Sequence, residues 1–258
     1  MFSLACVTGA SSGIGKELCK LLAKRHIPLL ITGRDERALH ALAEELTIYV
    51  AVHIVVCDLS KKEDRTHLIQ EMRLLKPDLV VNNAGFGLYG EAISYAVEDT
   101  LSMIEVNIAA VAEITLEAII LLKKDRRTGT ILNVSSVAAY FRPFPSFVTY
   151  AASKDFVLSF SRGVDNESSA YGIRVLTAVP GQVKTGFRFR AAKGVEQKDS
   201  SLAMSASFAA KQIWKQIQTQ KRVSLFDWRY KMAILLSHFI PKPLIAMLLK
   251  HSIKRLLA

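Results

Sequence analysis

The sequence predicts an α/β protein in which helices cover both faces of a parallel sheet. Three observations support this fold class. The chain has 258 residues, a length that suits one domain with a substantial core. Short apolar runs alternate with segments of helical period, the order that gives parallel strands and right-handed crossovers. The runs also lack polar alternation, as expected where both faces of a sheet are buried. We therefore expect a single-domain, doubly wound sheet of the Rossmann type.

The expected elements follow one another regularly along the chain. The apolar runs expected as strands are residues 4–7, 28–32, 49–57, 79–82, 130–134, 174–179 and 223–226. The segments expected as helices are residues 14–25, 37–46, 65–75, 100–124, 147–171 and 205–219. No repeat, low-complexity tract or linker interrupts this order, so the sequence gives no reason to expect a second domain.

Two segments depart from the strand–helix order. The main part of the domain is expected to span residues 1–227, and within it residues 186–204 suggest an extended loop or mobile lid. Residues 228–258 are apolar and basic and are broken by two prolines, which predicts two short amphipathic helices as a C-terminal extension of the same domain. These helices have three open roles: lying in a membrane interface, covering a substrate pocket or packing against another subunit.

The positive charge of the chain is concentrated at its C-terminal end. Residues 187–258 hold 14 of the 34 basic side chains and 3 of the 23 acidic ones, which accounts for the net charge of +11. No recognised nucleic-acid motif accompanies this excess, so nucleic acid is not an expected partner. Peripheral contact with an anionic membrane, an anionic substrate carrier and a solvated basic face are the alternatives that explain it.

The remaining composition limits the compartment and the chemistry. Cys6, Cys19 and Cys57 have no metal-ligand spacing and are interpreted as core residues of a reducing compartment, which favours the cytoplasm. The six histidines are scattered, so no metal site is predicted. Leu4–Val7 is already a strand, which leaves no room for a leader, and no apolar run approaches the ~20 residues that span a bilayer.

A glycine-rich turn joins the first expected strand to the first helix. Residues 8–15 read TGASSGIG, with the spacing Gly-x-x-x-Gly-x-Gly. Gly9 suits a tight turn, Gly13 a close approach of the backbone to a ligand, and Gly15 the packing of the helix on the strand. Because the amides at a helix N-terminus bind phosphate, this turn predicts the pyrophosphate site of a dinucleotide.

The end of the second strand bears on the choice of dinucleotide. Arg34 lies at the edge of the expected adenosine pocket, and its guanidinium group matches the 2′-phosphate of NADP(H); alternatively it points into solvent. Asp35 lies near the position of the acid that binds the ribose 2′-hydroxyl in NAD-dependent folds. We interpret Asp35 as the N-cap of the following helix, an interpretation that favours NADP(H) over NAD(H).

Two further strand ends are expected to border the nucleotide. Asp58-Leu59 follows the third strand, and Asn82-Asn83-Ala84-Gly85 closes the fourth. Open α/β sheets bind ligands at the carboxyl ends of their strands. The aspartate is suited to accept a hydrogen bond from an adenine amino group, while the small Ala84-Gly85 turn allows the backbone to approach the nucleotide.

Candidate catalytic residues follow later in the chain. Tyr150 and Lys154 stand four residues apart on one face of an expected helix. An ammonium group beside a phenol would lower the tyrosine pKa and make it a general acid or base. Ser136, just past the fifth strand, is placed to donate a hydrogen bond to a substrate carbonyl, and Ser135 competes for that role.

Together these residues closely resemble the short-chain dehydrogenase/reductase family over about residues 3–186. The resemblance is carried by the glycine turn, Asp58, Asn82–Gly85, Asn107, Ser136, Tyr150-x-x-x-Lys154 and Pro180-Gly181-x-Val183-x-Thr185. It implies that Tyr150 exchanges a proton with the substrate oxygen, which Ser136 orients. It also implies that Lys154 holds the nicotinamide ribose and tunes Tyr150, and that Asn107 supports a proton relay through water and Lys154. The cofactor-binding residues are then Gly9, Ser11, Ser12, Gly13, Ile14, Gly15, Arg34, Asp58, Leu59, Asn83, Ala84, Gly85, Tyr150, Lys154, Pro180, Gly181, Val183 and Thr185.

The activity implied is NADP(H)-dependent reduction of a ketone or aldehyde to an alcohol. An apolar or lipid-like substrate is expected, because six phenylalanines are available to line a pocket: Phe86, Phe141, Phe144, Phe147, Phe187 and Phe189. A 3-oxoacyl-thioester reductase is the enzymatic alternative, since an anionic carrier would suit the basic C-terminal part. The alternative of another class is a non-catalytic NADP(H)-binding redox sensor or membrane-peripheral scaffold, against which the presence of Asn107, Ser136, Tyr150 and Lys154 argues.

The resemblance also implies a homodimer or homotetramer in which helices 100–124 and 150–171 pair across a two-fold axis. One departure from the family concerns spacing. Ser136 and Tyr150 are fourteen positions apart, one more than in many members, and residues 142–145 are expected to hold the extra residue on the substrate side. This departure weakens any transfer of substrate identity from better-known steroid or acyl-carrier reductases.

Overall fold

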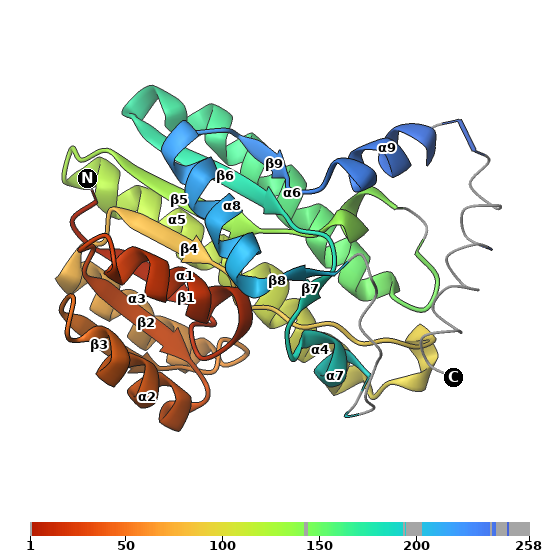
Figure 1. The fold of residues 1–258 in the computed structure, drawn as a ribbon, viewed down its shortest axis with the longest axis horizontal. Helices are drawn as coiled ribbons and strands as arrows, with labels where there is room; N and C mark the ends of the chain where they lie inside the picture. The colour runs from red at the N-terminus through yellow and green to blue at the C-terminus, as the bar shows by residue number, and fades with distance from the viewer. Residues whose placement is uncertain are drawn as a thin grey trace.

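In the computed structural model, which describes residues 2–141, 144–192, 194, 203–237, 239–240 and 247, seven parallel strands form one sheet (Figure 1). The strands are β1 (Ala5–Thr8), β2 (Leu29–Gly33), β3 (Val52–Val56), β4 (Leu79–Asn82), β5 (Gly129–Val134), β6 (Ile173–Val179) and β9 (Val223–Leu225). They lie in the order β3-β2-β1-β4-β5-β6-β9. Every strand expected from the sequence is present, and the prediction of a doubly wound parallel sheet is confirmed.

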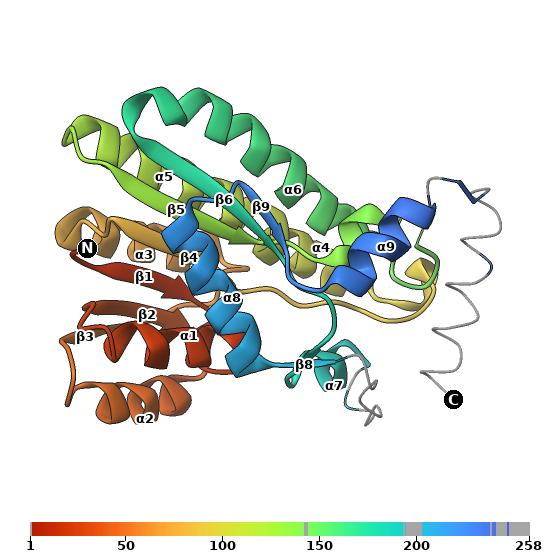
Figure 2. The same cartoon turned by 45° about the horizontal axis from the view of Figure 1, so that its top comes forward.

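Helices cover both faces of the sheet (Figure 2). On one face lie α1 (Gly13–Ala23), α2 (Glu36–Leu46) and α8 (Ala206–Thr219); on the other lie α3 (Lys62–Leu75), α5 (Ala110–Lys124) and α6 (Val148–Ser168). Successive side chains of β1 alternate between these layers, since Ala5 and Val7 pack in the first and Cys6 in the second. Both faces of the inner strands are therefore buried, which explains their unbroken apolar sequence.

The edge strands are less buried than the sequence pattern predicted. Val56 of β3 is 43% exposed, and β9 is only partly buried along its whole length. β3 also begins at Val52, three residues later than expected, because residues 47–50 still form the turn and bend that follow α2. Apolar residues precede the first paired residue of β3, so composition alone placed the start of this strand too early.

The helix expected over residues 100–124 consists of three parts. α4 (Val97–Ile104) leads into the π-helical turn η2 (Glu105–Ala109), which continues as α5. Arg65 of α3 braces this segment. Its side chain is 7% exposed and forms ion pairs of 2.9 Å with Glu105 and 2.7 Å with Glu113. The wider π turn changes which residues of this segment face the sheet.

Residues 186–204 are more regular than the extended loop expected of them. α7 (Phe187–Ala191) is a short helix, and β7 (Val183–Lys184) pairs in parallel with β8 (Met204–Ser205). Elements of two to five residues are too short to produce a sequence period, so the pattern does not predict them. Residues 193 and 195–202 lie outside the described residues, so the expectation of a mobile lid is not tested there.

α9 (Trp228–Ser237) is the first of the two helices expected at the C-terminal end. The second falls mainly on residues 241–246 and 248–258, which lie outside the described residues. Within the described residues, no helix has both the length and the hydropathy that crossing a membrane requires. Short 3₁₀ turns complete the described elements: η1 (Ala92–Ser94), η3 (Val137–Tyr140) and η4 (Ser169–Tyr171).

The three cysteines belong to the core, as the sequence predicted. Cys6, Cys19 and Cys57 are free and buried. Burial raises the thiol pKa of Cys6 and of Cys57 to about 12, and the pKa of Cys19 also rises. Because the thiolate is the reactive form, these side chains are inert apolar residues that fill the layers on the two sides of the sheet.

Candidate active site

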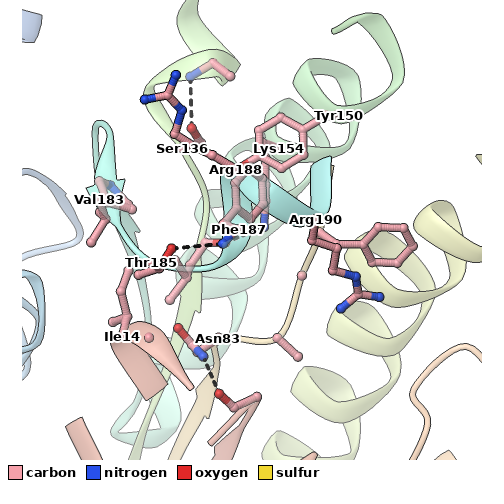
Figure 3. Close-up of a pocket in the computed structure, with 18 of the residues that line it drawn as sticks. Ile14, Asn83, Ser136, Tyr150, Lys154, Val183, Thr185, Phe187, Arg188 and Arg190 are labelled. Atoms are coloured by element: carbon pink, nitrogen blue, oxygen red, sulfur yellow. Dashed lines mark hydrogen bonds between the residues drawn. The ribbon is translucent and has the colours of Figure 1, made fainter. Parts of the chain in front are cut away.

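The carboxyl ends of the strands open into a cavity of about 700 Å³. It lies where β1 and β4 are neighbours, the position at which the strand order reverses and open α/β sheets bind ligands. Of the residues predicted to bind cofactor or substrate, all except Gly15, Asn107 and Phe189 line this cavity. Figure 3 shows part of the lining, which brings the glycine turn, the ends of the later strands, the start of α6 and helix α7 together.

The glycine turn has the backbone shape that the sequence predicted. Gly9 and Gly13 have φ values of +65° and +54°, a region that favours glycine. At Gly15 a Cβ atom would lie 2.3 Å from the carbonyl oxygen of Gly9, so only glycine lets α1 pack this closely on the turn. Ser12, the N-cap of α1, makes no side-chain capping hydrogen bond. The N-terminal amides of α1 are thus left to a ligand at the cavity, and a phosphate group fits them.

Asn83 ties the end of β4 to this turn. Its side-chain nitrogen donates to the carbonyl oxygens of Thr8, at 3.0 Å, and Gly9, at 3.2 Å (Figure 3). In return, the Thr8 hydroxyl oxygen accepts hydrogen bonds from the backbone amides of Asn83 and Ala84, both at 3.0 Å. These bonds fix the two loops relative to each other, so the glycine turn and the Ala84-Gly85 turn form one unit.

Arg34 and Asp58 face each other at the adenosine end of the cavity, with Arg34 Nη1 4.0 Å from Asp58 Oδ2. The other carboxylate oxygen of Asp58 accepts from the amide and hydroxyl of Ser60, at 3.0 and 2.8 Å. Asp35 accepts from the amide of Ala38 at 3.0 Å and caps α2, which confirms the N-cap interpretation. Arg34 thus presents a guanidinium group to this end of the cavity, while Asp35, which also lines it, uses one carboxylate oxygen to cap α2.

Arg190 of α7 brings a second guanidinium group to the same cavity, which the sequence pattern did not predict. It lies over the ring of Phe86, 4.4 Å from the ring centre. Burial lowers its pKa, the neighbouring charge of Arg34 lowers it further, and Asp58 partly offsets this. An anion bound between the two arginines would relieve that repulsion. The sequence signal that could have identified Arg190 is the alternation of two arginines with two phenylalanines in residues 187–190.

Tyr150 and Lys154 lie in the first turns of α6 and point into the cavity (Figure 3). Burial lowers the pKa of Lys154 to about 8, and its Nζ donates to the carbonyl oxygen of Val134 at 2.9 Å. Burial also raises the pKa of Tyr150, against the opposing effect of a hydrogen bond with Ser136. The lowered tyrosine pKa expected from the Tyr–Lys pair is therefore not found in the protein alone. Lys154 Nζ lies 5.7 Å from the Tyr150 ring centre, and burial of the phenol is the largest cause of its raised pKa.

The two candidate serines have different partners. Ser135 is buried, and its hydroxyl donates to the carbonyl oxygen of Lys154 at 2.6 Å. Ser136 is less buried, accepts from the amide of Ala138 at 3.2 Å and forms its hydrogen bond with Tyr150. Ser135 thus anchors α6 to β5, while Ser136 shares the cavity surface with the Tyr150 hydroxyl. This geometry favours Ser136 over Ser135 as the residue that orients a substrate oxygen.

Asn107 lies beneath the cavity and does not line it. It is fully buried in η2, where its side chain accepts from the amide of Phe86 at 3.2 Å and donates to the Phe86 carbonyl at 2.9 Å and to Ser153 Oγ at 3.0 Å. A Cβ at Gly85 would lie 3.0 Å from Asn107 Oδ1 and 3.2 Å from Lys154 Nζ. The side chain of Asn107 therefore positions the 85–86 backbone, and the proton relay through water remains a prediction.

Aromatic rings form the substrate side of the cavity. Phe147 stacks on Tyr150 with ring centres 4.3 Å apart, and Phe187 lies 5.4 Å from the Tyr150 ring centre. Five of the six predicted phenylalanines line the cavity, whereas Phe189 is 51% exposed and does not. In the segment with the extra residue, residues 142 and 143 lie outside the described residues, and Phe144 lines the cavity.

Further lining residues were missed by the sequence analysis. Tyr89 lies in the loop after β4, Arg188 on α7, and Tyr230 on α9. Arg188 is buried, and its side chain forms a hydrogen bond with Tyr89. These residues come from loops and short helices whose positions depend on tertiary packing, so no local spacing marked them.

Comparison with known proteins places these features in a family. The family model for short chain dehydrogenases matches residues 3–195. Sulfoacetaldehyde reductase 2 of Chromohalobacter salexigens is 32% identical over 190 residues, which cover 72% of this chain and 75% of that protein. Human 17-beta-hydroxysteroid dehydrogenase type 3 is 33% identical over 185 residues, 70% of this chain and 59% of that protein.

A solved structure shows the same architecture. The short-chain dehydrogenase from Sphingobium yanoikuyae, in complex with NADPH, superposes with a TM-score of 0.81 at 27% sequence identity, covering 86% of each chain. The range matched by the family model includes the glycine turn, Tyr150, Lys154 and the turn after β6. The chain belongs to the short-chain dehydrogenase family and is an oxidoreductase of alcohol and carbonyl groups that uses a nicotinamide nucleotide.

Proposed function

We propose that the protein is an NADPH-dependent carbonyl reductase with Tyr150 as its general acid. One observation carries the proposal: Ser136, Tyr150 and Lys154 line the same cavity as the glycine turn and Arg34. A reducing nucleotide and a carbonyl substrate can then meet in one space, with a proton donor beside them. Free, buried cysteines suit the reducing conditions of a cytoplasmic enzyme.

Tyr150, Ser136 and Lys154 have separate roles in the proposed reduction. When bound, the nicotinamide supplies a hydride to the carbonyl carbon. Burial keeps the Tyr150 hydroxyl protonated, so it is ready to give its proton to the substrate oxygen. Ser136 hydrogen bonds with Tyr150 and is placed to donate to the same substrate oxygen. Lys154 is positioned by the Val134 carbonyl to supply positive charge near that oxygen and to hold a ribose hydroxyl.

Two arginines support a preference for NADPH over NADH. Arg34, which follows β2, and Arg190, on α7, both line the cavity, and the charge of Arg34 acts on Arg190. Guanidinium groups bind phosphate oxygens through charge-assisted hydrogen bonds. The Sphingobium relative was solved with NADPH, in agreement with this preference. The carboxylate of Asp35, which would otherwise favour NADH, caps α2.

The lining of the cavity bears on the substrate. Phe147 and Phe187 lie against the Tyr150 ring, and Phe144 packs on Phe147; this apolar lining suits a carbonyl carried on an apolar body, and one relative is named for a hydroxysteroid. Arg188 adds a buried positive charge on the same side, and another relative is named for sulfoacetaldehyde. A substrate panel should therefore include apolar ketones, apolar aldehydes, anionic aldehydes and 3-oxoacyl thioesters.

The test of catalysis compares Tyr150→Phe with the wild type. Removing the phenol proton should lower NADPH-dependent turnover of the best panel substrate by about 10²- to 10⁴-fold. Affinity for NADPH, measured by fluorescence, should stay unchanged. Tyr171→Phe is the matched control, because Tyr171 is 52% exposed just beyond α6, and it should retain full turnover. If Tyr150→Phe keeps wild-type turnover, the proposed mechanism is wrong.

The test of cofactor preference uses charge-removing variants. Arg34→Gln should raise the dissociation constant for NADPH by about ten- to a hundredfold, the effect of losing a charge-assisted hydrogen bond. Arg190→Gln should weaken NADPH binding in the same direction. Both variants should leave NADH binding unchanged, and Arg37→Gln, an exposed position on α2, should change neither. Equal weakening of both nucleotides by Arg34→Gln would contradict the assignment to the 2′-phosphate.

A further inference from the structure

Helix α9 has two different apolar faces. On its inner face, Tyr230 packs on the backbone of Gly181, where a Cβ would lie 2.1 Å from the ring, and Ala233 lines the cavity. On its outer face, Trp228 is 70% exposed, Leu235 54% and Leu236 55%. Figures 1 and 2 both show α9 at the outside of the molecule, beyond the carboxyl ends of β6 and β9. The helix therefore walls the substrate side of the cavity and also presents apolar side chains to solvent.

The exposed residues form a stripe at helical spacing. With Met232 and Phe239, which are 45% and 81% exposed, they occupy positions 228, 232, 235, 236 and 239. Residues separated by three or four positions lie on one side of a helix. Phe239 follows the last turn, and its amide donates to the carbonyl of Leu236. Single exposed apolar residues are ordinary, but a contiguous stripe with Trp, Phe and Leu marks a binding surface. We call positions 228, 232, 235, 236 and 239 the α9 stripe.

The charge around the α9 stripe indicates what binds it. Residues 228–258 contain six basic side chains and no acidic one. Lys231 lies on α9 itself and is exposed. Two copies of such a segment meeting across a symmetry axis would repel each other, whereas an anionic lipid surface attracts it. Tryptophan is also favoured at the boundary between lipid headgroups and acyl chains.

We propose that the α9 stripe docks the enzyme on an anionic membrane, with α9 lying in the headgroup interface. The apolar side chains enter the lipid while the basic residues of α9, Arg229 and Lys231, contact anionic headgroups, the usual arrangement of an interfacial amphipathic helix. Because the opposite face of α9 walls the cavity, docking brings the substrate side close to the bilayer surface. That last consequence rests on the proposed reductase function, whereas the docking itself does not.

Vesicle flotation of the full chain tests this proposal. The protein should float with phosphatidylglycerol-containing vesicles, stay unbound with pure phosphatidylcholine vesicles, and be released by high salt. Leu235→Glu combined with Leu236→Glu should reduce the floated fraction roughly tenfold or more, since it places two charges in the apolar stripe. Leu74→Glu is the matched control, because Leu74 is a 74% exposed leucine on the distant helix α3. NADPH binding, unchanged in both variants, shows that the fold is intact.

Other occupants of the stripe give different results. Failure of the wild type to float with anionic vesicles, or equal flotation of the Leu235/Leu236 variant, would overturn the proposal. If a second copy of the chain occupies the stripe, the wild type should sediment as an oligomer that does not float with vesicles. The Leu235/Leu236 variant should then sediment as a smaller species. An independent readout is Trp228 fluorescence in a Trp214→Phe background, because the chain has two tryptophans. Docking predicts quenching by brominated lipid, and unquenched emission would contradict it.

Discussion

At the scale of single residues, the active site buries two titratable groups, and burial shifts each toward its neutral form. Tyr150 is 7% exposed and Lys154 is 4% exposed. For the phenol, neutrality means a retained proton, which suits the donor of a reduction. For the ammonium group, neutrality means loss of the charge that the site uses. With a pKa of about 8, Lys154 still carries its charge near neutral pH, although burial destabilises the charged form. Destabilising groups of this kind are common where function requires them.

Replacing Lys154 by methionine should stabilise the protein when no nucleotide is bound. The pKa falls from 10.5 to about 8, so burying the charge costs up to about 3 kcal/mol. The variant loses the hydrogen bond to the Val134 carbonyl, which offsets about 1 kcal/mol of that gain in stability. We expect Lys154→Met to have a free energy of unfolding about 2 kcal/mol above the wild type at pH 7, and to lose turnover.

The pH dependence of this difference identifies its cause. Below pH 8 both folded and unfolded states carry the proton, and the full penalty applies to the wild type. Between pH 8 and 10.5 the unfolded state binds more protons than the folded state, so the stability of the wild type rises with pH. The advantage of Lys154→Met should therefore shrink across that window in urea titrations. An advantage that is constant from pH 7 to 10 would contradict the burial argument.

At the scale of secondary structure, the sequence predicted every strand of the sheet and most helices. Parallel strands buried on both faces produce long apolar runs, and the glycine turn marks the first strand–helix junction by its steric needs. The π turn η2 was not predictable in the same way. An apolar segment from 97 to 124 has the same periodicity with or without one wide turn. The turn depends on Arg65, 40 positions before Glu105, and no local pattern reveals that pairing.

The ion pairs of Arg65 should be important for stability. Glu105→Gln combined with Glu113→Gln leaves the buried guanidinium with the carbonyl of Leu59 and no carboxylate partner. Only the cation of these pairs is buried, while the two carboxylates are partly exposed, so breaking both pairs should cost about 1 to 3 kcal/mol and lower the urea midpoint. Glu117→Gln is the control, since it breaks a more exposed pair with Arg73 and should cost less than about 1 kcal/mol.

Adding Arg65→Met to the double variant separates the charge effect from packing. Without the buried cation there is no unpaired charge, so much of the lost stability should return. Turnover should fall in the variants in which η2 is distorted, because η2 carries Asn107. If the double glutamine variant is as stable as Glu117→Gln, the Arg65 pairs do not brace η2.

At the scale of the whole molecule, exposed apolar side chains occur in the α9 stripe and also on α5 and α6. In the second set, which we call the α5–α6 face, Leu116 and Ile120 of α5 are 44% and 57% exposed, and Phe156 of α6 is 37% exposed. The sequence showed apolar positions on both helices but not which ones face the sheet, because a buried and an exposed stripe have the same period. Packing decides this: Val111, Ile114 and Ala118 turn inward, leaving the other set outside.

We propose that the α5–α6 face is the dimer interface implied by the sequence resemblance. The wild type should sediment as a dimer or tetramer, and Ile120→Glu should shift it toward monomer, because a carboxylate buried at an apolar interface has no partner. Leu74→Glu, on α3, should leave the assembly unchanged. Analytical ultracentrifugation at several concentrations makes the measurement, and circular dichroism checks the fold of each variant. A monomeric wild type, or an Ile120→Glu variant that sediments like the wild type, would contradict this interface and leave those side chains as ordinary exposed surface.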